Sequence, residues 1–265
     1  MKTTMKTAML ITAFALLATP VAAQNALDGT WVLEVDSVQP SDRPTVLLLQ
    51  NNTYVCQSCT PVQTLKIDGQ FHPITNDPYS DAMSVRVMDA RTVARQYRKG
   101  EVVVAESTDT ISADGQQREY AFTDRTSANG TPVTGRTISR RVEDGPAGAH
   151  ALSGGWQVVR YEGFSDDVLT ISLRVDGETL HMTSPLGERS VARFNGPSVP
   201  VEGDSSGLTV AVIRADPSTI VQIGKRNGQV VDVTTMSVAP DGRTMDIVSQ
   251  DAETGATMSY RARKS

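Results

Sequence analysis

The chain has 265 residues, with 25 basic and 30 acidic side chains and a formal net charge of −5. This acidic balance argues against nucleic acid and anionic membrane surfaces as partners, because both select patches of lysine and arginine. Aromatic residues make up only 5% of the chain. The core must therefore rest on aliphatic side chains, and a large pocket lined by aromatic rings is not expected.

The first residues have the composition of a secretory signal peptide. Lys2 and Lys6 precede an apolar run over 8–18, and small residues precede Gln24. The apolar run is shorter than the ~20 residues that a helix needs to span a bilayer. We therefore predict a signal peptide over residues 1–23, no membrane insertion, and a mature protein that is periplasmic or secreted. Removing this segment leaves 23 basic and 30 acidic residues, a net charge of −7.

The mature chain alternates apolar and polar residues with a period of two, as over 31–35, 83–87 and 171–175. This period is typical of strands with one buried face. Asp-Gly or Asn-Gly pairs, which favour tight hairpin turns, begin at positions 68, 114, 129, 176, 195, 227 and 241. Strands joined by tight turns pair with their sequence neighbours, so the pattern predicts an all-β, antiparallel, up-and-down fold.

The chain also contains an internal repeat. Leu27–Trp31 is matched by Leu152–Trp156, and Lys66–Gly69 is matched by Arg193–Gly196 at an offset of 127 residues. A period of this length corresponds to a whole domain rather than a solenoid unit. We predict a duplicated β-domain of eight or nine strands, with the first copy over 24–143, a linker over 144–151 and the second copy over 152–265. Closing each copy into a small barrel would remove its exposed edges.

Each copy opens with a Gly-x-Trp motif at the head of its first strand, Gly29-Thr30-Trp31 and Gly154-Gly155-Trp156. In this the chain resembles the calycins, the superfamily of lipocalins and fatty-acid-binding proteins. It is also similar to uncharacterised secreted bacterial proteins with a doubled domain of this kind. The resemblance implies two barrels, each with a core tryptophan at one end and an arginine of the last strand packed across the indole. Arg141 and Arg261 occupy the matching places, where a cation–π contact would close the barrel.

The two cysteines, Cys56 and Cys59, occur in the first copy only. In an oxidising compartment this spacing favours a disulfide across a short loop. A redox role remains an alternative, although such a role usually requires a helix N-terminus that the strand pattern lacks. A metal site is a further alternative, but His72 is the only other ligand nearby. Haem attachment would require a histidine where Thr60 stands.

Catalytic motifs are not found in the sequence. The histidines are His72, His150 and His181, and none accompanies a nucleophile in a known pattern. Asp77 and Asp204 occupy equivalent places in the two copies, where they either cap a bend or line the barrel openings; we favour the bend. We predict no catalytic residue, no metal site and no cofactor.

These features favour a non-enzymatic binding protein for a small apolar or amphipathic ligand, held in a barrel mouth or between the domains. The inward residues expected to contact such a ligand are Trp31, Met83, Val85, Trp156, Leu208 and Val210. An alternative is a protein-interaction or envelope structural module with solid barrels. An unrecognised hydrolase or redox enzyme is a third possibility.

Overall fold

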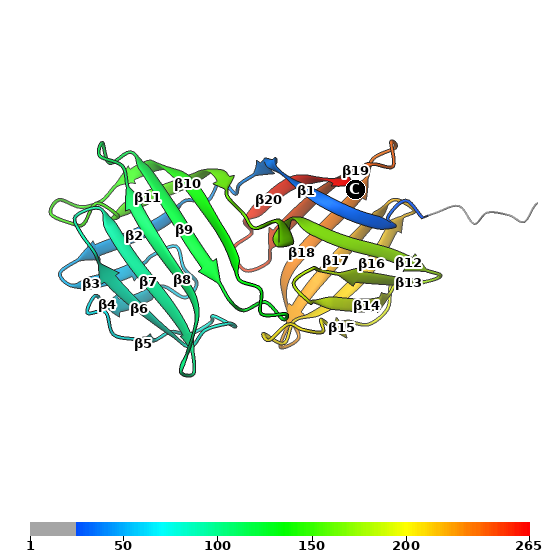
Figure 1. Cartoon of the computed structure of the whole chain (residues 1–265), viewed down its shortest axis with the longest axis horizontal. Helices are drawn as coiled ribbons and strands as arrows, with labels where there is room; N and C mark the ends of the chain where they lie inside the picture. Colours follow the sequence, from blue (N-terminus) through cyan, green and yellow to red (C-terminus); the bar gives the residue numbers. More distant parts are fainter. Residues whose placement is uncertain (1–24) are drawn as a thin grey trace, which may run out of the picture.

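The computed structural model describes residues 25–265, except for the side chains of Asp166 and Asp167. The predicted signal peptide, residues 1–23, lies outside the described residues. Within them the chain forms antiparallel strands and one short 3-10 helix, η1 (Asp166–Leu169). The strands build two ten-stranded sheets, each curled into a nearly closed barrel (Figure 1). The prediction of an all-β chain with two antiparallel barrels is confirmed.

Ten strands form the first barrel. In spatial order they are β4 (Gln63–Lys66), β3 (Thr53–Cys56), β2 (Thr45–Gln50), β11 (Gly154–Glu162), β10 (Val133–Asp144), β9 (Gln117–Asp124), β8 (Val102–Ile111), β7 (Thr92–Lys99), β6 (Ala82–Val87) and β5 (His72–Pro73). The amide of Gly69, just after β4, donates a hydrogen bond of 3.1 Å to the Val85 carbonyl on β6, which brings the two edges of the sheet together.

The second barrel repeats this order. Its strands are β14 (Arg189–Arg193), β13 (Thr179–Thr183), β12 (Thr170–Asp176), β1 (Gly29–Gln39), β20 (Thr257–Lys264), β19 (Thr244–Asp251), β18 (Gln229–Val238), β17 (Thr219–Arg226), β16 (Thr209–Asp216) and β15 (Val199–Pro200). The edges meet where Phe194 pairs with Val212 in an isolated bridge, and the Asn195 amide donates to the Val212 carbonyl at 2.8 Å.

The barrels do not coincide with the sequence repeats. Strand β1 pairs with β12 and β20, so the opening strand of the first copy belongs to the second barrel (Figure 1). Strand β11, which opens the second copy, pairs with β2 and β10 in the first barrel. The first barrel is therefore continuous over 45–162 and is inserted between β1 and β12. The chain crosses between barrels at 40–44 and again at 163–169.

The segment predicted as a linker, 144–151, is consequently not a connection between barrels. It turns the chain from β10 to β11, which are paired from Asp144 opposite Gly154 onward. Adjacent strands joined by a short turn pair with each other, and this rule applies here across the boundary between the two copies. The predicted ranges 24–143 and 152–265 describe the duplication. Each range, however, gives its first strand to the barrel that the other range mainly forms.

Each barrel has one tryptophan in its apolar core. Trp31 and Trp156 are fully buried, and their indole N–H groups donate to the carbonyls of Leu27 and Leu152 at 2.9 and 2.8 Å. The guanidinium of Arg141, directly opposite Trp156 on β10, lies 4.1 Å from the indole ring. The Arg141 guanidinium therefore lies over the buried indole, within cation–π range.

The second barrel uses a different residue from the one expected. Lys264 lies directly opposite Trp31, and its ammonium is 4.7 Å from the indole ring. Arg261 is three residues earlier on β20, is largely exposed, and lies 3.8 Å from a carboxylate oxygen of Glu34. Register makes Lys264 the counterpart of Arg141, because the loop before the last strand is shorter in the second copy.

A disulfide joins Cys56 and Cys59, whose Cα atoms are 5.4 Å apart, as the spacing predicted.

The barrels touch where the Asn129 amide donates to the Leu186 carbonyl at 3.0 Å and the Tyr79 hydroxyl donates to Asp204 at 2.9 Å. Among the described residues, no helix is long and apolar enough to cross a membrane.

Deleting residues 25–39 should unfold the second barrel and leave the first intact, because β12 and β20 would then lose their shared partner. The remaining tryptophan, Trp156, lies in the first barrel and reports on it alone. We expect its emission to stay at the short wavelength of a buried indole while part of the far-ultraviolet β signal is lost. If the deletion variant instead keeps the full native β signal, the assignment of β1 to the second barrel is wrong.

Candidate functional sites

The residues predicted to contact a ligand lie within the protein interior. Trp31, Met83, Val85, Trp156 and Val210 are all at most 1% exposed, and Leu208 is half-buried. The two tryptophans, Met83 and Val85 belong to the apolar cores of the barrels. Among the described residues, none of the six lines the pockets described below. Two other features of the structure therefore carry the functional argument.

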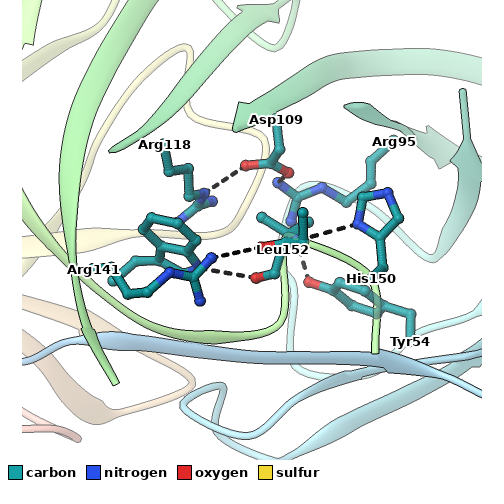
Figure 2. Close-up of polar contacts among 9 residues, drawn as sticks. Tyr54, Arg95, Asp109, Arg118, Arg141, His150 and Leu152 are labelled. Carbon is teal, nitrogen blue, oxygen red and sulfur yellow. Dashed lines mark hydrogen bonds and ion pairs between the residues drawn. The ribbon is translucent and has the colours of Figure 1, made fainter. Parts of the chain in front are cut away.

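The first feature is an ion cluster inside the first barrel. Asp109 on β8 is fully buried and lies between Arg95 on β7 and Arg118 on β9, both 6% exposed. One carboxylate oxygen accepts a hydrogen bond from a terminal nitrogen of Arg95. The other accepts a hydrogen bond of 2.7 Å from the Nε of Arg118. Figure 2 shows the two guanidinium groups approaching the carboxylate from opposite sides.

Aromatic side chains surround this cluster. The other terminal nitrogen of Arg95 donates to the Tyr54 hydroxyl at 3.1 Å (Figure 2). The Tyr120 ring lies 5.3 Å from the Arg95 guanidinium and 5.4 Å from that of Arg118, within cation–π range. Burial acts against the charge of Arg95, but the adjacent Asp109 carboxylate raises its pKa above the ordinary value. Burial also raises the pKa of the Tyr97 hydroxyl.

The second barrel lacks this cluster. Equivalent positions follow from the strand registers, in which Val85 opposite Arg95 corresponds to Val212 opposite Gln222. By the same offset, Met236 stands for Asp109 and Met245 stands for Arg118, and both methionines belong to the apolar core. The second barrel therefore forms the same fold with apolar residues at two of these positions, which indicates that the fold does not require the ions.

A charged cluster at this depth is costly to maintain. Ion pairs removed from water lose solvation that their mutual attraction only partly returns, so apolar replacements of similar volume are often as stable or more stable. The sequence contains a signal for this cluster, although no motif marks it. Arg95 and Arg118 stand at inward positions of strands, where the matching residues of the other copy are uncharged.

The second feature is an apolar pocket of about 200 Å³ at the junction of the barrels. It is lined by Leu33, Val35 and Val38 of β1, Met258 and Tyr260 of β20, Tyr161 of β11, Phe164, and Val168 and Leu169 of η1. Nearly all of this lining is apolar. Burial raises the pKa of the hydroxyls of Tyr161 and Tyr260.

The crossover segment 163–169 covers this pocket from the side of the first barrel. Phe164 lies 5.9 Å from both Phe122 and Tyr161, measured between ring centroids. Gly135 makes room for these rings, since a Cβ there would lie 3.0 Å from ring atoms of Phe122 and Phe164. The Ser165 amide donates to the Thr134 carbonyl at 3.1 Å, which ties the segment to β10. The junction pocket therefore has walls from both barrels.

A larger, polar pocket of about 660 Å³ lies on the first barrel and is lined in part by Asp68, Arg86 and His150. The His72 ring bonds Asp68 at 2.8 Å, and this hydrogen bond lowers the pKa of the Asp68 carboxyl. His150 bonds the Asp89 carbonyl, and His181 lies on the second barrel. Among the described residues, no three histidine, cysteine or acidic side chains are grouped as metal ligands.

Asp77 and Asp204 cap bends, the reading that we favoured from the sequence. Asp77 accepts hydrogen bonds from the amides of Tyr79 and Ser80, and Asp204 accepts from those of Ser206 and Leu208.

Comparison with known proteins adds nothing to the geometry of these sites, because no family model, curated protein or solved structure matches the chain.

Replacing the ion cluster by the residues of the second barrel tests whether the first barrel needs it. The triple variant Arg95→Gln, Asp109→Met, Arg118→Met should be as stable as the natural protein or more stable by up to ~4 kcal/mol. Asp109→Met alone leaves two buried arginines without a counter-charge and should cost about 3–5 kcal/mol. Urea unfolding followed by circular dichroism measures both. A triple variant as unstable as the single one would make the cluster a structural requirement.

Proposed function

We propose that this protein is a non-enzymatic binding protein that holds a small apolar or amphipathic molecule in the junction pocket. The observation that carries the proposal is the composition of that pocket, nine apolar or aromatic side chains around about 200 Å³. Apolar cavities of comparable size, about 150 Å³, stay dry and take up small aromatic molecules such as benzene. A ligand with one ring or a short aliphatic chain matches this volume.

The origin of the walls supports a binding role. Leu33 and Val35 come from a strand that closes the second barrel, whereas Phe164 comes from the segment that leads out of the first. Ligand sites commonly lie at barrel mouths and where domains meet. Tyr161 and Tyr260 carry the side-chain hydroxyls of the lining and would face the polar end of an amphipathic ligand.

We also propose a periplasmic or secreted location. The disulfide between Cys56 and Cys59 supports this proposal, because such bonds persist in oxidising compartments and are rare in the cytosol. The basic and then apolar N-terminal sequence points the same way.

Binding of toluene, followed by saturation-transfer NMR, tests the proposed function. Val35→Phe adds a ring to the pocket wall and should weaken toluene binding by about tenfold or more, since the volume is then occupied. Val32→Phe is the matched control. Val32 lies on the same strand, is 36% exposed and does not line the pocket, so its variant should bind toluene as the natural protein does.

Equal toluene signals from all three proteins would show that the probe binds elsewhere. Native mass spectrometry of the protein purified from its producing cells complements this test, because a retained small molecule appears as added mass that is lost on denaturation. A natural protein that neither binds toluene nor retains any small molecule would contradict the proposal.

A further inference from the structure

The charges inside the first barrel do not balance. Arg95 and Arg118 each carry one positive charge, and both bond the single carboxylate of Asp109. All three side chains are at most 7% exposed. Buried charges in proteins are ordinarily paired, because an isolated one loses its hydration without compensation. Water can satisfy free N–H groups, but it cannot supply the missing negative charge.

Two hydrogen-bond donors next to this excess charge have no partner within the part of the chain that the structure describes. The terminal nitrogens of Arg95 bond Asp109 and Tyr54, while its Nε has no partner; the Oγ of Ser107 also has none. Ser107 is 5% exposed and lies directly opposite Arg95 in the pairing of β7 with β8. Side chains at opposite positions of antiparallel strands have Cβ atoms about 4.5–5.5 Å apart. Two unused donors therefore flank the uncompensated positive charge.

The second barrel again provides the comparison. There, Gln222 replaces Arg95 and Thr234 replaces Ser107, and the Thr234 hydroxyl bonds Ser249 at 3.0 Å. The position of Arg95 is thus neutral in the second barrel, where the Oε1 of Gln222 finds no partner among the described residues, and the hydroxyl of Thr234 opposite it is satisfied. The net positive charge at this place in the sheet therefore distinguishes the first barrel from the second.

We propose that the interior of the first barrel binds one small monovalent anion, of the size of a halide, between the Nε of Arg95 and the hydroxyl of Ser107. Arg118 contributes the second positive charge, and Asp109 holds both guanidinium groups in place. Hydrogen bonds from charged donors to anions are the stronger kind, which suits a site with only two direct donors. This site shares no residue with the junction pocket, so it stands or falls independently of the proposed function.

Bromide is a suitable probe, because it can be located by anomalous scattering and does not strengthen apolar burial as kosmotropic anions do. We would measure thermal unfolding in sodium bromide and in sodium gluconate at equal ionic strength, since gluconate is too large to enter. Bromide should raise the unfolding midpoint of the natural protein in a saturable way. Crystals soaked in bromide should show an anomalous peak beside Arg95 and Ser107.

Two serine variants locate the site without disturbing the ion cluster. Ser107→Ala removes a proposed ligand and should weaken bromide binding by about tenfold or more, the loss expected for one hydrogen bond to a charged group. Ser139→Ala is the control. Ser139 is fully buried and its hydroxyl is also unpartnered, but it lies opposite Arg118 and should leave bromide binding unchanged. Neither change breaks a hydrogen bond within the protein, so both variants should fold.

Three results would overturn the inference. The first is an unfolding midpoint that does not distinguish bromide from gluconate. The second is an equal bromide effect in the natural protein and in Ser107→Ala. The third is loss of binding in Ser139→Ala with retention in Ser107→Ala, which would move the anion to Arg118.

Discussion

The position of β1 between β12 and β20 is the constraint on which the rest of the structure depends. Without it, β12 and β20 would become unpaired edges and the core of the second barrel would lose its tryptophan. With it, the first barrel becomes an insertion in the second, joined to it by two connections, at 40–44 and 163–169. Two connections restrict the relative movement of the barrels more than a single linker would. They also bring β1 and the crossover segment to the same place, which is why the junction pocket exists.

The two copies share a backbone but differ in where they place polar groups. On the outer face of β16–β19, the second barrel has a row of apolar side chains: Ala211, Ile213, Val221, Ile223, Val233 and Val248. The matching residues of the first barrel are Ser84, Arg86, Ala94, Gln96, Glu106 and Ala121. The first barrel is thus the more polar one on this outer face as well as inside. Its ion cluster therefore belongs to a general divergence of the two copies rather than to one isolated substitution.

The sequence was sufficient for the all-β class, the turns and the disulfide, because each leaves a local pattern, but it predicted eight or nine strands per copy where each barrel has ten. It was insufficient for the pairing of β1, since alternation shows which face of a strand is buried but not which strand lies beside it. The expected role of Arg261 failed for a related reason, because a shorter loop before β20 shifts the register and places Lys264 opposite Trp31. Arg95 and Arg118 could have been found by comparing the copies position by position. The junction pocket could not, because Val35 and Phe164 meet only through the crossing of the chain between barrels.

The barrel that contains the buried ions also has more stabilising cross-links than the other barrel. Arg141 donates hydrogen bonds of 2.7 Å to the carbonyls of Gly115, Ala151 and Ser153, whereas Lys264 donates one of 3.1 Å to Ala26. The disulfide is likewise confined to the first barrel, where it follows the buried Tyr54 that bonds Arg95. Buried ions lower stability relative to an apolar core, and cross-links and charge-assisted hydrogen bonds raise it. A barrel that keeps an internal charge for binding would need this reinforcement, whereas one filled with methionines would not.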